Sequence, residues 1–186
     1  YLYEVDLSPK QQEIHKKIKG LANNAEFEAA INLSESLLET HQTTQEKKDP
    51  YGQLVINHGI IKSADLDYSS GLIAIEEGLI LLERNHGPFS PSLVRGIMAK
   101  AITEFFLKLP EKAEDSFRRA QHIVHRDKGV YGAPQLPVLS WITKTNLQQG
   151  KFLSADREQR FSLRVAEQSF GKESVDLIPF LNSLGA

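Results

Sequence analysis

The chain has 186 residues, with 22 basic against 24 acidic side chains, 40% hydrophobic residues and no cysteine. This composition is typical of a folded, water-soluble chain and excludes disordered or collagen-like sequence. The near-neutral charge provides no broad positive field for phosphate contacts, and no apolar run is long enough to cross a bilayer, so we expect neither nucleic-acid binding nor membrane insertion. The missing cysteine excludes disulfides, thiolate nucleophiles and Cys-ligated zinc, but it leaves a cytoplasmic and a periplasmic location equally open.

The first residues alternate between apolar and polar side chains. Tyr3 and Val5 are separated by Glu4, and this period of two predicts a short extended arm over residues 1–8. We expect the arm to pack on the first helix rather than to join a sheet. Ser8 and the proline after it are a typical helix cap and first helical residue.

Four later segments can be laid on one another without gaps, and they indicate a repeat. They begin at Phe27, Tyr68, Ala113 and Phe152. Each has a small residue three positions after its start, namely Ala30, Gly71, Ser116 and Ala155. Nineteen positions after each start come Glu46, Gly87, Gly132 and Gly171. Glycine just beyond a periodic apolar stretch is a common helix stop, so each segment predicts a long helix.

A second helix is expected after each of these stops. Prolines that suit a first helical turn follow the first three stops, at Pro50, Pro91 and Pro137. Apolar residues at helical spacing then predict second helices over about 50–65, 91–108, 135–149 and 174–186.

The stretch from Tyr68 to Gly87, with the Pro-Phe-Ser-Pro that follows it, resembles the tetratricopeptide repeats (TPR). The resemblance is to the long variety of about 42 residues found in kinesin light chains and many bacterial proteins. Leu181-Asn182-Ser183-Leu184-Gly185 is similar to the Leu-Asn-Asn-Leu-Ala helix of that variety. The resemblance implies an all-α, right-handed α-α superhelix of about four helical hairpins plus a terminal unpaired helix.

We therefore expect a single TPR-like domain over 9–186, preceded by the arm over 1–8. The helical pairs are expected at about 9–46, 50–87, 91–132 and 135–171, with a half repeat at 174–186. The last helix carries many apolar side chains, and no polar capping helix follows it. We expect the chain to be a fragment of a longer, bacterial-type protein, able to self-associate through this helix.

Motifs that carry chemistry are scarce. The sequence holds no Gly-rich phosphate loop, no His-Glu-x-x-His and no Gly-x-Ser-x-Gly. His122 and His125 are the closest pair of histidines, and we interpret them as solvated or packing side chains rather than metal ligands. The basic stretch from Arg118 to Lys128 is interpreted as ordinary charge balance. We predict no catalytic residue, metal or cofactor, and hence no enzyme.

The resemblance places the binding surface in a concave groove lined by the second helices, where an asparagine commonly hydrogen-bonds the backbone of an extended peptide. Asn57 and Asn182 keep that asparagine, whereas Met98 and Thr143 stand at the places aligned with it in the middle repeats. Trp141 is expected either as an aromatic anchor or as part of the core between helices, and lysines on these helices favour a carboxylate. The candidate partner-binding residues are Asn57, Lys62, Lys100, Thr103, Trp141, Lys144, Gln148 and Asn182.

The predicted function is that of a non-enzymatic scaffold that binds a partner protein or peptide in a preorganised groove. One alternative is a sensor of a small ligand or signal peptide that changes its curvature on binding. Another is a structural or oligomerisation arm of a larger envelope or secretion-related protein. The sequence does not identify the partner.

Overall fold

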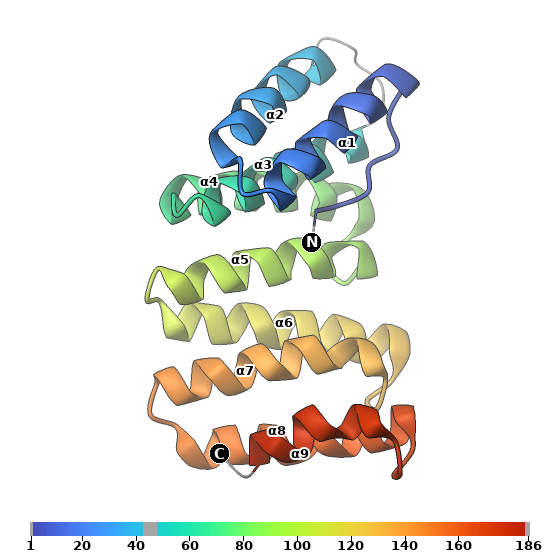
Figure 1. Ribbon diagram of the computed structural model, residues 1–186, viewed down its shortest axis with the longest axis vertical. Coiled ribbons are helices and arrows are strands. Elements are labelled where there is room, and N and C mark those ends of the chain that lie inside the picture. The colour runs from blue at the N-terminus through green and yellow to red at the C-terminus, as the bar shows by residue number, and fades with distance from the viewer. Residues whose placement is uncertain (1, 43–47, 185–186) are drawn as a thin grey trace. The chain divides into compact units, whose positions relative to one another are not determined.

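The structure is a computed structural model that describes residues 2–42 and 48–184, and within these ranges it contains helices and no strand (Figure 1). The expected stop at Glu46 and the chain ends at Tyr1 and Ala186 lie outside the described residues. The α-helices are α1 (Pro9–Asn23), α2 (Phe27–Gln42), α3 (Lys48–Ala64), α4 (Tyr68–His86), α5 (Val94–Phe106), α6 (Pro110–Lys128), α7 (Leu136–Gln148), α8 (Phe152–Phe170) and α9 (Ile178–Leu184). Short 3-10 helices, η1 (Pro91–Leu93), η2 (Ala133–Gln135) and η3 (Val175–Leu177), lead into α5, α7 and α9.

The long helices recur with one fixed period. α4, α6 and α8 each span 19 residues and begin at Tyr68, Pro110 and Phe152, in steps of 42. The glycines that end them, Gly87, Gly129 and Gly171, have positive φ and keep the same step. The left-handed residues before them, Leu66, Lys108 and Gly150, also keep it. Each repeat therefore closes both of its turns with a left-handed residue, which satisfies the last carbonyls of the preceding helix.

This period corrects the expected start of the third segment. α6 begins at Pro110, so Ala113 is the small residue at its third position after the start and not the start itself. Its helix ends before Gly129 rather than at Gly132. With this register the four small residues Ala30, Gly71, Ala113 and Ala155 are all buried. The error arose because Ser116 and Gly132 offered a second match three residues further along the chain.

The chain divides into two compact units, residues 1–107 and 108–186. In the first unit α3 is the central helix, since every residue from 54 to 59 is buried. Its core includes the fully buried Ile56, Ile75, Leu82 and Ile97. In the second unit the fully buried Phe117, Leu139, Ile142 and Val165 join α6, α7 and α8. The all-α class is confirmed. None of the described helices has both the length and the apolar character that crossing a membrane requires.

The backbones of α3 and α4 approach each other through glycines. A Cβ added at Gly59 would lie 2.6 Å from the carbonyl oxygen of Gly71 and 2.9 Å from the amide nitrogen of Ile75. These are main-chain atoms, which cannot rotate away as the end of a flexible side chain can. Gly59 therefore sets the distance at which the central helix packs on α4.

We predict that Gly59→Ala lowers the free energy of unfolding by about 2 kcal/mol or more, because the new methyl group forces the two helices apart. Gly20→Ala is the matched control. Gly20 is exposed within α1 and an added Cβ meets nothing within 4 Å, so the substitution should stabilise the chain by about 0.5–1 kcal/mol. Urea unfolding of the two variants beside the original chain measures both effects, and equal stabilities would contradict the proposed constraint.

Candidate functional site

The extended arm, residues 2–8, runs from the start of α1 and reaches α3 and α5 within the first unit (Figure 1). Asn57 on α3 binds its main chain in both directions. The Tyr3 amide donates to Asn57 Oδ1 at 2.6 Å, and Asn57 Nδ2 donates to the Tyr3 carbonyl oxygen at 3.0 Å. Asn57 is 3% exposed, so its carboxamide is committed to the main chain of Tyr3 rather than to water. One side chain thus replaces the pair of bonds that a neighbouring β-strand would make.

Two basic side chains hold the adjacent carbonyl groups of the arm. The His15 ring on α1 lies 3.0 Å from the Tyr3 carbonyl oxygen, and because a carbonyl only accepts, Nε2 carries the proton and donates it. Arg95 donates to the Leu2 carbonyl oxygen at 2.6 Å. Three consecutive main-chain groups of the arm are therefore bonded to side chains from α1, α3 and α5.

The Tyr3 side chain is inserted at the start of α5. Its hydroxyl donates to the carbonyl oxygen of Ser92 at 2.9 Å and accepts from the amide of Gly96 at 2.8 Å. The Arg95 guanidinium lies 5.1 Å from the centre of the ring, a cation–π distance. Burial raises the pKa of Tyr3 to about 12, although the Gly96 amide and Arg95 oppose the rise, so the hydroxyl keeps its proton at neutral pH.

The alternation seen in the sequence appears as two faces of the arm. Tyr3 and Val5 point inward, with 7% and 2% of their surface exposed, whereas Glu4 and Asp6 are exposed. Lys19 pairs with Glu4 at the surface, where such an ion pair adds little stability. Residues 2–8 form neither helix nor strand, and the expectation that the arm packs on the first helix was incomplete, because its side-chain partners also lie on α3 and α5.

The other candidate residues of the first unit do not join Asn57 at the arm. Lys62 lies 3.6 Å from Glu35 on α2 and borders a hollow of about 290 Å³ between α2, α3 and α4. Lys100 lies 2.7 Å from Glu76 on α4. Each lysine already faces a carboxylate of its own chain. Thr103 is 2% exposed and hydrogen-bonds Ser63 across the contact between α5 and α3, at 3.1 Å.

In the second unit Trp141, Lys144 and Gln148 follow one another along α7. The Lys144 ammonium lies 4.5 Å from the centre of the Trp141 ring, which also stacks on Phe117 of α6 at 5.8 Å. Trp141 is half-buried, so it contributes to the contact between helices and still presents part of its ring. Lys144 and Gln148 are exposed.

The 42-residue step also changes which residue corresponds to Asn57. α3, α5 and α7 end at Ala64, Phe106 and Gln148, so the position of Asn57 is repeated at Ala99 and Trp141. Met98 and Thr143, which the sequence alignment had placed there, lie one and two residues away. α2 begins 41 rather than 42 residues before α4, and this difference of one residue partly offsets the three-residue shift of the third segment.

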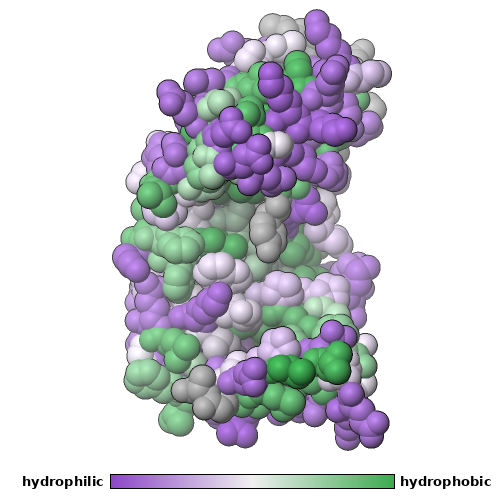
Figure 2. All heavy atoms as spheres, in the orientation of Figure 1, coloured by the Kyte–Doolittle hydropathy of each residue, from purple (hydrophilic) through white to green (hydrophobic). Residues whose placement is uncertain are grey.

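Asn182 is exposed on α9, beside a group of exposed apolar side chains. The space-filling view shows hydrophobic side chains in the region of α9 (Figure 2). Ile178 and Leu181 on α9, and Val175 on η3 before it, are exposed. The self-association expected of this helix stays a prediction.

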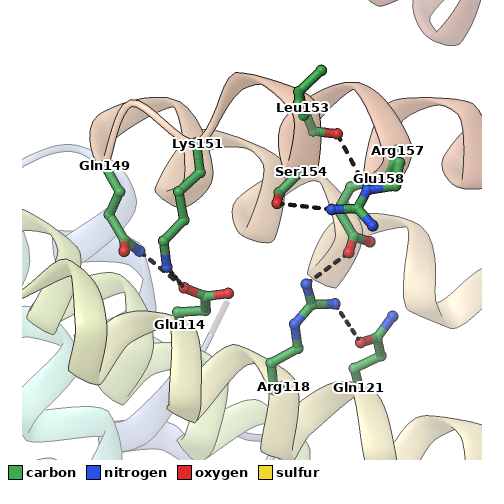
Figure 3. Close-up of polar contacts among 9 residues, drawn as sticks. All are labelled: Glu114, Arg118, Gln121, Gln149, Lys151, Leu153, Ser154, Arg157 and Glu158. Atoms are coloured by element: carbon green, nitrogen blue, oxygen red, sulfur yellow. Dashed lines mark hydrogen bonds and ion pairs between the residues drawn. The ribbon is translucent and has the colours of Figure 1, made fainter.

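A polar cluster joins α6 to the turn between α7 and α8 and to α8 itself (Figure 3). Glu114 accepts from Gln149 at 3.0 Å and from Lys151 at 2.9 Å, and Arg118 donates to Glu158 at 2.7 Å. Burial raises the pKa of Glu114, but the hydrogen bonds from Lys151 and Gln149 outweigh it and leave the pKa lowered. Arg118 is thus part of a structural ion pair, in agreement with its interpretation as charge balance.

Ser34, Glu35 and His58 bring together the residue types of a hydrolytic triad. Ser34 Oγ lies 2.6 Å from His58 Nδ1, and His58 Nε2 lies 3.7 Å from Glu35. Both Ser34 and His58 are only 6% exposed, and the Ser34 hydroxyl also reaches the carbonyl of Ile31 at 2.8 Å. A hydroxyl buried in this way joins α2 to α3 and is not presented to a substrate.

The histidines do not assemble a metal site in the described parts of the chain, where no three His, Asp or Glu side chains converge. His125, one of the two close histidines, lies 2.6 Å from Gln135 Oε1 and thereby ties α6 to η2.

Comparison with known proteins finds similar structures but no related sequence. No protein-family model and no curated protein matches the sequence. Among solved structures, BtubC (BKLC) from P. vanneervenii superposes with a TM-score of 0.79 at 16% identity, over 91% of this chain and 70% of that one. The nearly identical TPR-like repeats of a putative kinesin light chain from Podosopora anserina superpose with a TM-score of 0.83 at 11% identity, over 94% and 83%.

The chain has a TPR-like helical repeat fold. A variant of the Podosopora protein superposes equally well, with a TM-score of 0.82. The expected resemblance to the long, kinesin-light-chain type of repeat is confirmed at the level of fold. At identities of 11–16% the superposition carries neither a partner nor a site.

Sequence reasoning missed most of the residues that hold the arm, namely His15, Ser92, Arg95 and Gly96, and it gave Tyr3 no partner. The period-two arm was a usable signal for Tyr3, since its inward face had to find a partner. Nothing in the spacing of Ser92, Arg95 and Gly96 connects them to a segment about 90 positions earlier in the chain, and His15 lies only 12 positions from Tyr3 but carries no motif.

We predict that the Tyr3 hydroxyl makes stability pH-dependent in alkali. Its pKa is raised in the folded state, so its contribution is complete below pH 10 and is lost as pH rises towards about 12. Over this interval the chain should lose about 2 kcal/mol more than the Tyr3→Phe variant, which has no hydroxyl to ionise. Unfolding in urea at each pH measures the difference, and parallel pH curves would contradict the buried hydroxyl.

His15 should act in the opposite pH range. Burial lowers its pKa from 6.5, so the unfolded chain binds the proton more tightly and stability falls as pH drops below 6.5. His15→Gln retains a donor for the Tyr3 carbonyl but cannot ionise, and we expect it to flatten the loss of stability between about pH 7 and about pH 5. His58, whose pKa burial also lowers, is present in both proteins and accounts for the slope that remains.

Proposed function

We propose that the protein is a non-enzymatic scaffold that binds an extended peptide segment of a partner protein on the face of α1, α3 and α5 that the arm covers. The observation that carries this proposal is the pair of hydrogen bonds between the Asn57 carboxamide and the Tyr3 peptide unit, at 2.6 and 3.0 Å. These two bonds are made to main-chain atoms, which every peptide has. They can therefore form with any extended segment whose side chains fit the surface.

The surface is held in place before a peptide arrives. Asn57 lies on the buried central helix α3, and His15 is 3% exposed on α1. Because these side chains are fixed by packing, the peptide bears most of the loss of conformational freedom on binding. The arm is the first occupant of this surface, and a partner segment must displace it.

Displacement is a matter of effective concentration. A segment tethered by a few residues is present at its site at about millimolar effective concentration, so a partner segment needs either a higher affinity or a weakened arm. A change that weakens the arm therefore strengthens binding of the partner, and this gives the proposal a test in the full chain.

The remaining candidates of the sequence analysis stay proposals of lower priority. Trp141, Lys144 and Gln148 form a half-exposed aromatic and basic strip on α7 that could contribute a second contact. Lys62 and Lys100 are each paired with a glutamate, so a carboxylate ligand would have to compete with that partner. No observation favours the sensor or the structural-arm alternative over the scaffold.

We predict that a synthetic peptide with the sequence of residues 2–8, labelled with a fluorophore, binds the full chain carrying Tyr3→Ala and Val5→Ala. These substitutions remove both inward-facing side chains of the arm and so vacate the surface. Adding Asn57→Ala to this arm-weakened chain should lower the peptide's affinity about fivefold or more, since it removes two hydrogen bonds. Fluorescence anisotropy measures the affinity.

The matched control is Asn32→Ala in the same arm-weakened chain, which removes an exposed asparagine from α2 and should leave the affinity unchanged. Circular dichroism confirms that each variant is folded. Failure of the peptide to bind a folded arm-weakened chain, or equal affinity with and without Asn57, would refute the proposed function.

A further inference from the structure

The geometry around Tyr3 points to a tyrosine-selective site: we infer that the peptide bound on α1, α3 and α5 is an extended partner segment carrying Tyr-x-β-branched, whose tyrosine hydroxyl completes the first turn of α5. The inference rests on the proposed function and specifies the chemistry of its ligand. Phenylalanine and phosphotyrosine at the same position are rejected.

The hydroxyl stands between an amide and a carbonyl group at the start of α5. Gly96 is four residues after Ser92, so in a regular α-helix its amide would donate directly to the Ser92 carbonyl. Here the amide donates to Tyr3 Oη at 2.8 Å, and Oη donates to the carbonyl at 2.9 Å. The insertion occurs where η1, with a Val94 to Pro91 bond between amide and carbonyl, changes into α5. The same junction recurs where η2 leads into α7 and η3 into α9, so the hydroxyl joins an amide and a carbonyl that the junction itself leaves unpaired with each other.

Both hydrogen-bonding roles of the hydroxyl are thereby used on main-chain groups. Gly96 is buried and Ser92 is half-buried. Phenylalanine would fill the same volume but leave an amide and a carbonyl without the hydroxyl that joins them. A site built to hydrogen-bond a hydroxyl discriminates strongly against the analogue that lacks it, because the buried polar groups are left unpaired.

Little room is left around the hydroxyl. Tyr3 is 7% exposed. A Cβ added at Gly96 would lie 3.2 Å from Tyr3 Oη, 2.8 Å from Leu79 Cδ2 and 3.0 Å from Ile56 Cδ1. The glycine therefore leaves the hydroxyl room beside the main chain. A phosphate on this oxygen would remove the proton that Tyr3 donates to Ser92, and would add a charged group to a largely buried side chain.

The position two residues after the tyrosine is selected by burial. Val5 is 2% exposed, and a β-branched side chain favours the extended backbone that the Asn57 contacts require. The residue between them, Glu4, faces solvent and leaves that position open to most side chains. The arm itself provides the occupant from which this pattern is taken.

The test compares three peptides on the folded, full-length chain carrying Tyr3→Ala and Val5→Ala. The peptides have the sequence of residues 2–8, with tyrosine, phenylalanine or phosphotyrosine at the position of Tyr3. We expect the tyrosine peptide to bind about tenfold more tightly than the phenylalanine peptide, and the phosphotyrosine peptide to bind more weakly still. Adding Gly96→Ala should reduce the affinity for tyrosine and bring the first two peptides to within about twofold of each other.

A second measurement does not depend on the doubly substituted chain. In the full chain, Tyr3→Phe should accelerate amide hydrogen exchange of Gly96 and Tyr3 several-fold, whereas amides of α8 should exchange at unchanged rates. Tyr3→Phe should also bind the added tyrosine peptide more tightly than the original chain does, since its tethered arm competes less well.

The outcomes separate the two proposals. Equal binding of the tyrosine and phenylalanine peptides, with both weakened by Asn57→Ala, would overturn tyrosine selectivity and leave the peptide-binding function standing. Absence of binding by every peptide would overturn both. A concentration-dependent dimer of the original chain that disappears in the arm-weakened chain would assign the site to the arm of a second copy and overturn the partner segment as its ligand.

Discussion

The structure depends on a small residue at one fixed place in each long helix. Ala30, Gly71, Ala113 and Ala155 lie three residues after the starts of α2, α4, α6 and α8, and all four are buried. Where the residue is glycine the constraint is tightest, because the backbones of α3 and α4 then come within a distance that a single methyl group would disturb. Close helix packing at this position fixes the spacing of the helices, and with it the distance between side chains on neighbouring second helices.

That spacing is what allows α1, α3 and α5 to bind one peptide segment together. Asn57, His15 and Arg95 each contribute one side chain to three successive main-chain groups. In isolation none of the three would hold a peptide, since each hydrogen bond to a flexible segment in water adds about 1 kcal/mol at most after its entropic cost. On three packed helices they bond to the same few main-chain atoms of the arm, and the Tyr3 hydroxyl adds a contact that depends on the side chain. In the proposed complex, backbone contacts would supply affinity and the hydroxyl would supply selectivity.

Much of the repeat could be predicted from the sequence, and the exception is instructive. The helix stops at Gly87 and Gly171 were placed correctly, because each glycine follows directly on a periodic apolar stretch and readily adopts the positive φ that ends a helix. The third segment was shifted by three residues, since Ser116 and Gly132 imitate the small residue and the stop, and a helix looks similar to itself after three or four residues. Because α2 begins 41 and not 42 residues before α4, the net displacement on α7 was two residues, and Thr143 was aligned with Asn57 in place of Trp141.

The sequence by itself determined the all-α class and the recurrence of a long helix followed by a second helix, because these follow from local periodicity and turn residues. The repeat length of about 42 residues came from the resemblance to the long TPR variety. Only the tertiary structure decided which atoms Asn57 binds, that Lys62 and Lys100 face glutamates, and that Tyr3 meets Gly96 at the start of α5. Those contacts join positions as far as 93 residues apart, and they depend on distances between packed helices. Such distances are set by the shapes of buried side chains in three dimensions, which no one-dimensional spacing encodes.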